Sequence, residues 1–144
     1  MGRTAIPSSF FVFTVVEHEG RFLVVRERKG DQGWYAPAGR LEPGETIAEA
    51  AVRETMEEAG VRVVPTSILR VDQQWFPSEG SGLSSWWRFV LIARPASAQI
   101  TPKSWADEHS LEARWLAFDE IAALPLRHPE VLEILALSRA QTAD

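Results

Sequence analysis

Residues 44–60 of the chain read GETIAEAAVRETMEEAG and predict the most clearly bounded helix in the sequence. Thr46 and Glu49 form a T-x-x-E capping box, in which the two side chains satisfy free backbone N–H groups of the first turn. Gly60 stands where helices commonly end on a left-handed residue. A helix between the capping box and Gly60 is therefore expected.

Three carboxylates gather on one side of this helix. Glu54, Glu57 and Glu58 fall within one arc because a helix advances about 100° per residue. Like charges at these spacings repel and destabilise a helix. A solvated face is one explanation, but such faces usually mix both signs of charge. The strip therefore indicates a site for a hard divalent cation such as Mg²⁺, which takes oxygen ligands and keeps waters and substrate phosphates in its other positions.

The other side of the same helix is expected to face the core, with the carboxylates lying opposite. Its members cluster between roughly 100° and 200° from Glu54. They are Ala48, Val52, Thr55, Met56 and Ala59.

The segments around the helix predict a mixed sheet with helices on both faces, an α/β/α arrangement. SFFVFTVV and RFLVVRE, joined by EHEG, are typical of a β-hairpin. WYAPAGRLEPGE is expected to be loop-rich, with at most one short strand. Further strands are predicted for VRVVP, SILRVDQQWF, WWRFVLIAR and LEARWLAF, with the loop PSEGSGLSS before the third, and short helices for FDEIAAL and HPEVLEILALSRA.

Length and composition set the broad class. A chain of 144 residues is expected to form one domain, residues 1–144, around one core. A net charge of -5 disfavours binding to a nucleic-acid polymer, which needs a basic face. The chain has no cysteine, so disulfides and cysteine nucleophiles are excluded. The first apolar run is too short for a membrane span and no signal-peptide cleavage site is evident, so a cytoplasmic location is expected.

The sequence from Gly39 onward reads Gly39-x5-Glu45-x7-Arg53-Glu54-x-x-Glu57-Glu58-x-Gly60-Val61. This resembles the signature of the Nudix hydrolases at all seven fixed positions. The resemblance covers 23 residues, and the predicted order of strands on either side is similar to the rest of that family's fold. It implies a Nudix-type pyrophosphohydrolase, in which water attacks a phosphorus of a nucleoside diphosphate linked to another moiety.

The resemblance also implies a metal site for Mg²⁺ or Mn²⁺. Glu54, Glu57 and Glu58 correspond to metal ligands, and one of Glu57 or Glu58 would also orient the water. The backbone carbonyl of Gly39 is a further ligand in many members. Metal ions there neutralise charge that develops on the phosphoryl oxygens. Arg53 reaches residues one turn away and is expected to hold a ligand carboxylate in place.

A further acid is expected from the segment SWADEHSLEARWL. Asp107, Glu108 and Glu112 are the three candidates, and Glu108 is preferred as an additional metal ligand or as the general base. His109 beside them is expected to be a solvated loop residue. The sequence leaves the identity of the general base open.

Short stretches outside the signature bear on the substrate. WYAPAGRLEPGET and WWRFVLIARP resemble the branch that hydrolyses oxidised guanine nucleoside diphosphates. The same stretches, with FLVV and QQWFP, also resemble a bacterial branch that hydrolyses nucleoside di- and triphosphates and thiamine-precursor pyrophosphate. The expected substrate is a small nucleotide or another pyrophosphate, and an oxidised guanine nucleotide is one candidate. A homodimer is compatible with the resemblance, although no stretch identifies an interface.

Five residues are candidates for substrate binding. The resemblance places a phosphate-binding arginine at Arg26, and Arg40 beside the signature is a second candidate. Trp34, Trp75 and Phe76 lie in loops or at strand ends, where an aromatic face can stack on a base. At least half of the other strand aromatics are expected in the core; these are Trp86, Trp87, Phe89 and Trp115.

Two alternatives stand beside hydrolysis of a nucleoside di- or triphosphate. One is a pyrophosphatase acting on dinucleotides or sugar nucleotides, of the NADH or ADP-ribose type. The other is a non-catalytic nucleotide-binding module on the same fold. Such modules typically lose one or more of the signature glutamates, and none is lost here.

Overall fold

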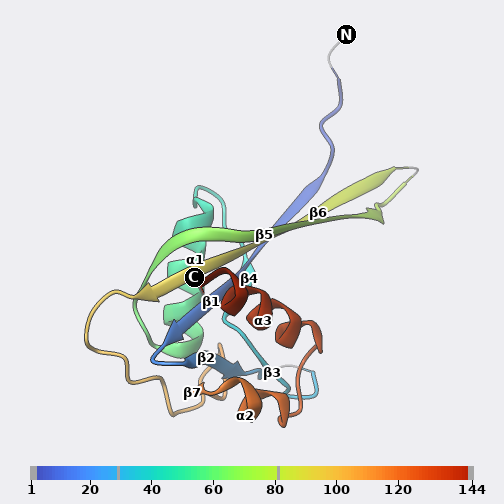
Figure 1. Cartoon of the computed structure of the whole chain (residues 1–144). Helices are drawn as coiled ribbons and strands as arrows, with labels where there is room; N and C mark the ends of the chain where they lie inside the picture. The colour runs from blue at the N-terminus through green and yellow to red at the C-terminus, as the bar shows by residue number, and fades with distance from the viewer. Residues whose placement is uncertain (1–2, 29, 81, 143–144) are drawn as a thin grey trace.

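The computed structural model describes residues 3–28, 30–80 and 82–142. They form a mixed sheet with helices on both faces (Figure 1). The strands are β1 (Ser8–His18), β2 (Arg21–Arg26), β3 (Trp34–Tyr35), β4 (Ala38–Arg40), β5 (Val63–Pro77), β6 (Leu83–Pro95) and β7 (Glu112–Leu116), and the helices are α1 (Ile47–Ala59), α2 (Phe118–Ala122) and α3 (Glu130–Thr142). This confirms the predicted fold class.

The sheet is ordered β3-β2-β1-β6-β5, with β4 also pairing β1 and β7 also pairing β2. The predicted hairpin of β1 and β2 is confirmed, and its turn residues Glu19 and Gly20 both have positive φ, as a tight type I′ turn requires. β1 lies at the centre because it pairs in parallel with β6 along most of its length. Its first half also pairs with β4, where Val12 stands opposite Gly39.

Two predictions about the strands are wrong. The stretch expected to hold at most one short strand holds two, because β3 and β4 each find a partner strand despite their few residues. The last three residues of VRVVP and all of SILRVDQQWF belong to one continuous strand, β5 (Val63–Pro77). Pro65 does not interrupt it, because the strand bulges between Pro65 and Ser67, where a residue without an N–H is tolerated. Of the predicted loop before β6, Ser81 lies outside the described residues.

Side chains of β1 contribute to the core on both faces of the sheet. Phe13 and Val15 pack with Ile134 and Leu135 of α3 on one face of the sheet. Val12 packs on the other face with the alanines of α1. The far ends of β5 and β6 project beyond both helix layers as a two-stranded arm (Figure 1). No helix within the described residues is long and apolar enough to cross a membrane.

Candidate active site

Both ends of α1 form as the sequence predicts. The hydroxyl of Thr46 accepts a hydrogen bond from the N–H of Glu49, and the carboxylate of Glu49 accepts one from the N–H of Thr46, each at 3.1 Å. Gly60 has a φ of 72° and its N–H donates to the carbonyl of Met56. The capping box and Gly60 therefore fix the two ends of α1. The ends in turn determine where the three glutamates lie along the helix.

The prediction of which side of α1 is buried is wrong. Thr55 and Ala59 are buried as expected, but Ala48 and Met56 are exposed. Glu58 lies on the buried side and is only 7% exposed. Apolar periodicity assigns the larger side chains to the core, but the side chains that fit closely against the sheet here are small alanines. The carboxylate side of the helix is therefore turned toward β4 rather than toward open solvent.

Glu58 and Glu54 both meet the backbone of β4. The carboxylate of Glu58 accepts a hydrogen bond from the N–H of Ala38 at 3.0 Å. The carboxylate of Glu54 occupies the space beside Gly39, where a Cβ atom would collide with it. Glycine at position 39 therefore leaves room for the Glu54 carboxylate in this position, and the Gly39 backbone lies directly beside a candidate ligand.

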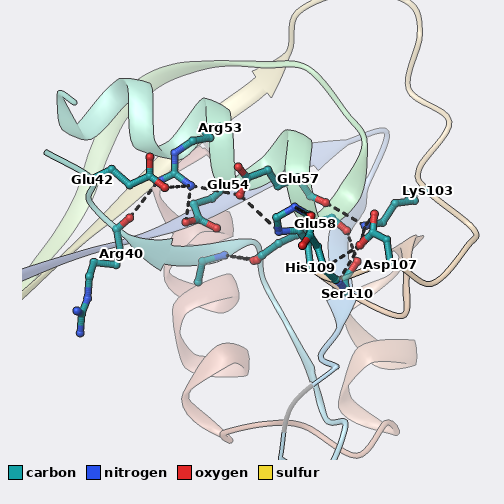
Figure 2. A network of polar contacts seen from close by, with 12 residues as sticks. Arg40, Glu42, Arg53, Glu54, Glu57, Glu58, Lys103, Asp107, His109 and Ser110 are labelled. Atoms are coloured by element: carbon teal, nitrogen blue, oxygen red, sulfur yellow. Dashed lines mark hydrogen bonds and ion pairs between the residues drawn. The ribbon is translucent and has the colours of Figure 1, made fainter. Parts of the chain in front are cut away.

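Arg53 connects the carboxylates of this region, as Figure 2 shows. Its guanidinium contacts Glu45 through two nitrogens, at 2.6 and 2.9 Å, and also reaches Glu54 at 2.9 Å and Glu57 at 3.2 Å. It donates a further bond to the carbonyl of Arg40 at 3.0 Å. Arg53 thus links the loop before the helix to two of the three glutamates.

The pKa values of these groups follow from burial and from Arg53. Burial raises the pKa of Glu58 well above its ordinary range, and its bond to Ala38 does not offset this. Burial also raises the pKa of Glu54, against the opposing effect of Arg53. The bond from Arg53 lowers the pKa of Glu45. A buried carboxyl with a raised pKa holds its proton unless a cation lies beside it.

The segment before β7 supplies the other wall of the site. The cavity between this segment and α1 has a volume of about 210 Å³, and Glu54, Glu58, Glu108 and His109 are among its lining residues. The ring of His109 lies 3.7 Å from the carboxylate of Glu57 and 3.5 Å from that of Glu108. His109 is an exposed loop residue, as expected. Its place at the edge of this cavity is not evident from the sequence.

The residues present fit a divalent cation. Carboxylate oxygens and a backbone carbonyl are the ligands that such cations prefer, and Glu58 is a buried acid whose charge a cation would neutralise. Within the described residues no three acidic or imidazole side chains are already gathered as a metal cluster. The same nitrogen of Arg53, Nη1, forms ion pairs with both Glu54 and Glu57.

A second cavity, of about 330 Å³, opens beside the first and shares Ala38 with it. Its lining includes Phe11 and Trp86, whose ring centres are 5.5 Å apart, together with Tyr35 and Arg88. Arg88 is held by ion pairs with Asp72 and Glu130. Such a mixture of aromatic walls and a few polar groups is typical of small-molecule sites.

The sequence did not single out the residues of this second cavity as substrate-binding. Phe11 comes from β1 and Trp86 from β6, and only the parallel pairing of these strands brings them together. At least half of the four strand aromatics, Trp86 among them, were expected to be core residues, but each of the four is only partly buried.

The five residues predicted to bind substrate lie in different places, and none of them lines either cavity. Arg26 ends β2 and lies 3.9 Å from Glu112, while the guanidinium of Arg40 lies over the ring of Phe11. Trp34 is buried in the core, a position that does not suit stacking on a base. Trp75 and Phe76 are 52% and 46% exposed on the arm of β5 and β6.

Comparisons with known proteins found relatives in sequence and in structure. The model of a family described as the NUDIX domain matches residues 6–137. Human 8-oxo-dGDP phosphatase NUDT18 is 36% identical over 125 residues, which are 85% of this chain and 36% of the human protein. Phosphatase NudJ of Escherichia coli K12 is 39% identical over 124 residues, which are 85% of this chain and 77% of NudJ. The chain thus spans about a third of the length of the human relative.

Solved structures show the same fold. A NUDIX hydrolase from Nitrosomonas europaea superimposes with a TM-score of 0.74 at 28% identity, covering 93% of this chain and 90% of the other. An ADP-ribose pyrophosphatase from Streptococcus suis superimposes with a TM-score of 0.70 at 16% identity, covering 94% of this chain and 92% of the other.

Proposed function

The chain belongs to the Nudix hydrolase family, and from this premise we propose that it hydrolyses a pyrophosphate bond in a nucleoside di- or triphosphate with the help of a divalent cation. The observation that carries the proposal is the position of the signature residues. Glu54 and Glu58 reach one cavity from α1, and the backbone of Gly39 lies beside the first of them. No signature glutamate is missing, which favours a hydrolase over a non-catalytic binding module.

Glu54, Glu57, Glu58 and the Gly39 carbonyl would hold Mg²⁺ or Mn²⁺, with Glu108 as a further ligand from the facing loop. The cation supplies charge neutralisation at the phosphoryl oxygens and lowers the pKa of bound water. Arg53 keeps the carboxylates of Glu54 and Glu57 oriented. His109 lies close enough to Glu57 to hold that carboxylate or an attacking water in place.

We place the nucleoside in the second cavity, against the aromatic wall that Phe11 and Trp86 form together. This wall can bind the face of a base, while Tyr35 and Arg88, each bonded to Glu130, form the polar part of the cavity. Because this cavity adjoins the first, a nucleotide held there directs its phosphates toward Gly39 and the glutamates. Arg40, whose guanidinium lies over the ring of Phe11, is the candidate for binding the phosphates.

An oxidised guanine nucleotide is the substrate we propose first. NUDT18 of human, mouse and zebrafish bears the name 8-oxo-dGDP phosphatase, and each shares 36% to 38% of its aligned residues with this chain. The substrate remains a proposal because this chain spans only about a third of those proteins.

Product analysis by mass spectrometry tests the proposed activity. The protein is incubated with Mg²⁺ and GDP, dGTP, oxidised dGDP, oxidised dGTP, ADP-ribose, NADH or a thiamine-type pyrophosphate. Glu58→Gln serves as the control, because an amide can still accept the bond from Ala38 without carrying charge. We expect a nucleoside monophosphate from the guanine diphosphates with the wild type only. Equal turnover by both proteins, or none by the wild type, contradicts the proposal.

A second pair of variants tests the nucleoside site. Base–aromatic stacking is worth about 1–3 kcal/mol, so Trp86→Ala is expected to raise KM by roughly 5- to 150-fold. Trp105→Ala removes the same side chain from an exposed position outside both cavities and is expected to leave KM unchanged. An unchanged KM in Trp86→Ala would place the nucleoside elsewhere.

A further inference from the structure

The segment between β6 and β7 fastens onto the last turn of α1 through two side chains (Figure 2). Lys103 is 3% exposed, and its Nζ donates to the backbone carbonyl of Glu57 at 2.9 Å. Ser110 is 1% exposed, and its Oγ donates to the backbone carbonyl of Glu58 at 2.6 Å. The two buried donors thus bind the two successive peptide units that carry candidate metal ligands.

These bonds reach carbonyls at the C-terminal end of α1. The last four carbonyls of a helix have no partner within the helix, and a cation near this end is favoured by the helix dipole. The N–H of Lys103 adds a bond to the carbonyl of Ala59 at 2.7 Å. Side chains and backbone of the segment therefore hold the end of α1 in one position against the sheet.

Asp107 makes the buried lysine possible and extends its influence to the cavity. Both of its carboxylate oxygens lie 2.8 Å from Nζ of Lys103. One of them also accepts the N–H of His109 at 2.8 Å and that of Ser110 at 3.2 Å. The same ion pair therefore fixes the backbone from which Glu108 and His109 reach the cavity.

We propose that Lys103 and Ser110 are positioning residues for metal binding. By fixing the peptide units of Glu57 and Glu58, they hold these carboxylates at the spacing that a cation requires, and through Asp107 they set Glu108 and His109 opposite. The proposal rests on the proposed metal-dependent hydrolysis and adds to it the residues that determine the geometry of the site. Partners that orient ligands in this way typically change metal affinity 10- to 100-fold when removed.

Ser110→Ala is the first test, with Ser138→Ala as its matched control. Both serines are 1% exposed, but Ser138 lies on α3, across the sheet from α1. Mn²⁺ binding is measured from the resonance signal of free Mn²⁺, and thermal stability is measured on the same samples. We expect Ser110→Ala to weaken Mn²⁺ binding about 10-fold. Ser138→Ala is expected to lower stability without changing Mn²⁺ affinity.

The steady-state constants separate positioning from a general loss of structure. At saturating Mn²⁺ and at a temperature where both variants are folded, Ser110→Ala should lower kcat while KM for the nucleotide stays unchanged. Lys103→Met should show a larger effect on Mn²⁺ affinity, and Lys103→Arg, which keeps the charge and the donors, should recover part of it. If Lys103→Met does not fold, Ser110→Ala decides the question.

The outcomes are distinguishable. Wild-type Mn²⁺ affinity in folded Ser110→Ala overturns the positioning role while leaving the metal site intact. Equal weakening of Mn²⁺ binding in Ser110→Ala and Ser138→Ala also overturns it, because the effect then follows from stability alone. A wild type that binds Mn²⁺ no better than Glu57→Gln overturns the proposed metal site itself, and the positioning role with it.

Discussion

Gly39→Ala is the sharpest test of how β4 and α1 share the candidate site. The added Cβ atom would overlap the carboxylate of Glu54. Ordinary contact between carbon atoms needs about 3.5–4.0 Å, so the carboxylate must move by more than about 1 Å. A displacement of about 1 Å costs on the order of 100-fold in rate at a catalytic site. We therefore expect kcat to fall about 100-fold.

Stability should change little in the same variant. The φ of Gly39 is not in the left-handed region, so alanine can adopt this backbone. The atoms that must move belong to the end of a flexible side chain, and the free energy of unfolding should fall by no more than about 1 kcal/mol. Activity and thermal stability are measured together, with Mg²⁺ and the substrate that the panel identifies.

Gly82→Ala is the matched control, because a Cβ there meets only the hydroxyl of Ser78 at 3.4 Å. We expect it to keep both activity and stability. A folded Gly39→Ala that retains more than half of the wild-type kcat would refute the reasoning. So would loss of folding in Gly39→Ala, because the collision would then involve more than the carboxylate of Glu54.

Three further outcomes are expected. Arg53→Lys loses the two-nitrogen contact with Glu45, so kcat should fall roughly 10- to 100-fold; a wild-type kcat would exclude an orienting role. Burial raises the pKa of Tyr35, the single tyrosine, to about 12, so tyrosinate absorbance should develop near pH 12 in the folded protein and near 10 in denaturant; the stability conferred by this shift is present below pH 10 and is lost between pH 10 and 12. The buried hydroxyl of Thr14 has no hydrogen-bond partner among the described residues, so Thr14→Val should raise the free energy of unfolding by about 1 kcal/mol, and destabilisation in a urea titration would contradict this.

What could be predicted from the sequence was mostly local. The capping box at Thr46 and the left-handed Gly60 define α1 from residues within one turn of each end, and the structure confirms both. The hairpin of β1 and β2 is equally local, because its turn is only two residues long. These features depend on backbone preferences that neighbouring residues determine.

The errors and omissions arose where distant segments meet. The side of α1 that carries Glu58 can be buried because the backbone N–H of Ala38 in β4 donates a hydrogen bond to Glu58. The spacing of apolar residues in the sequence does not predict that bond. Lys103 and Ser110 act on carbonyls of α1 that are far away in the sequence. The aromatic cavity is likewise formed by strands whose pairing had to be seen before its residues could be chosen.

The central position of β1 also constrains the order in which the chain can fold during synthesis. β1 is made before its parallel partner β6, which begins only at Leu83. The hairpin with β2 can close early, whereas the other edge of β1 stays open until most of the chain has left the ribosome. Non-local pairings of this kind form slowly and leave apolar strands exposed to aggregation. The glutamates of α1 are thus synthesised well before the sheet that will hold them in place is complete.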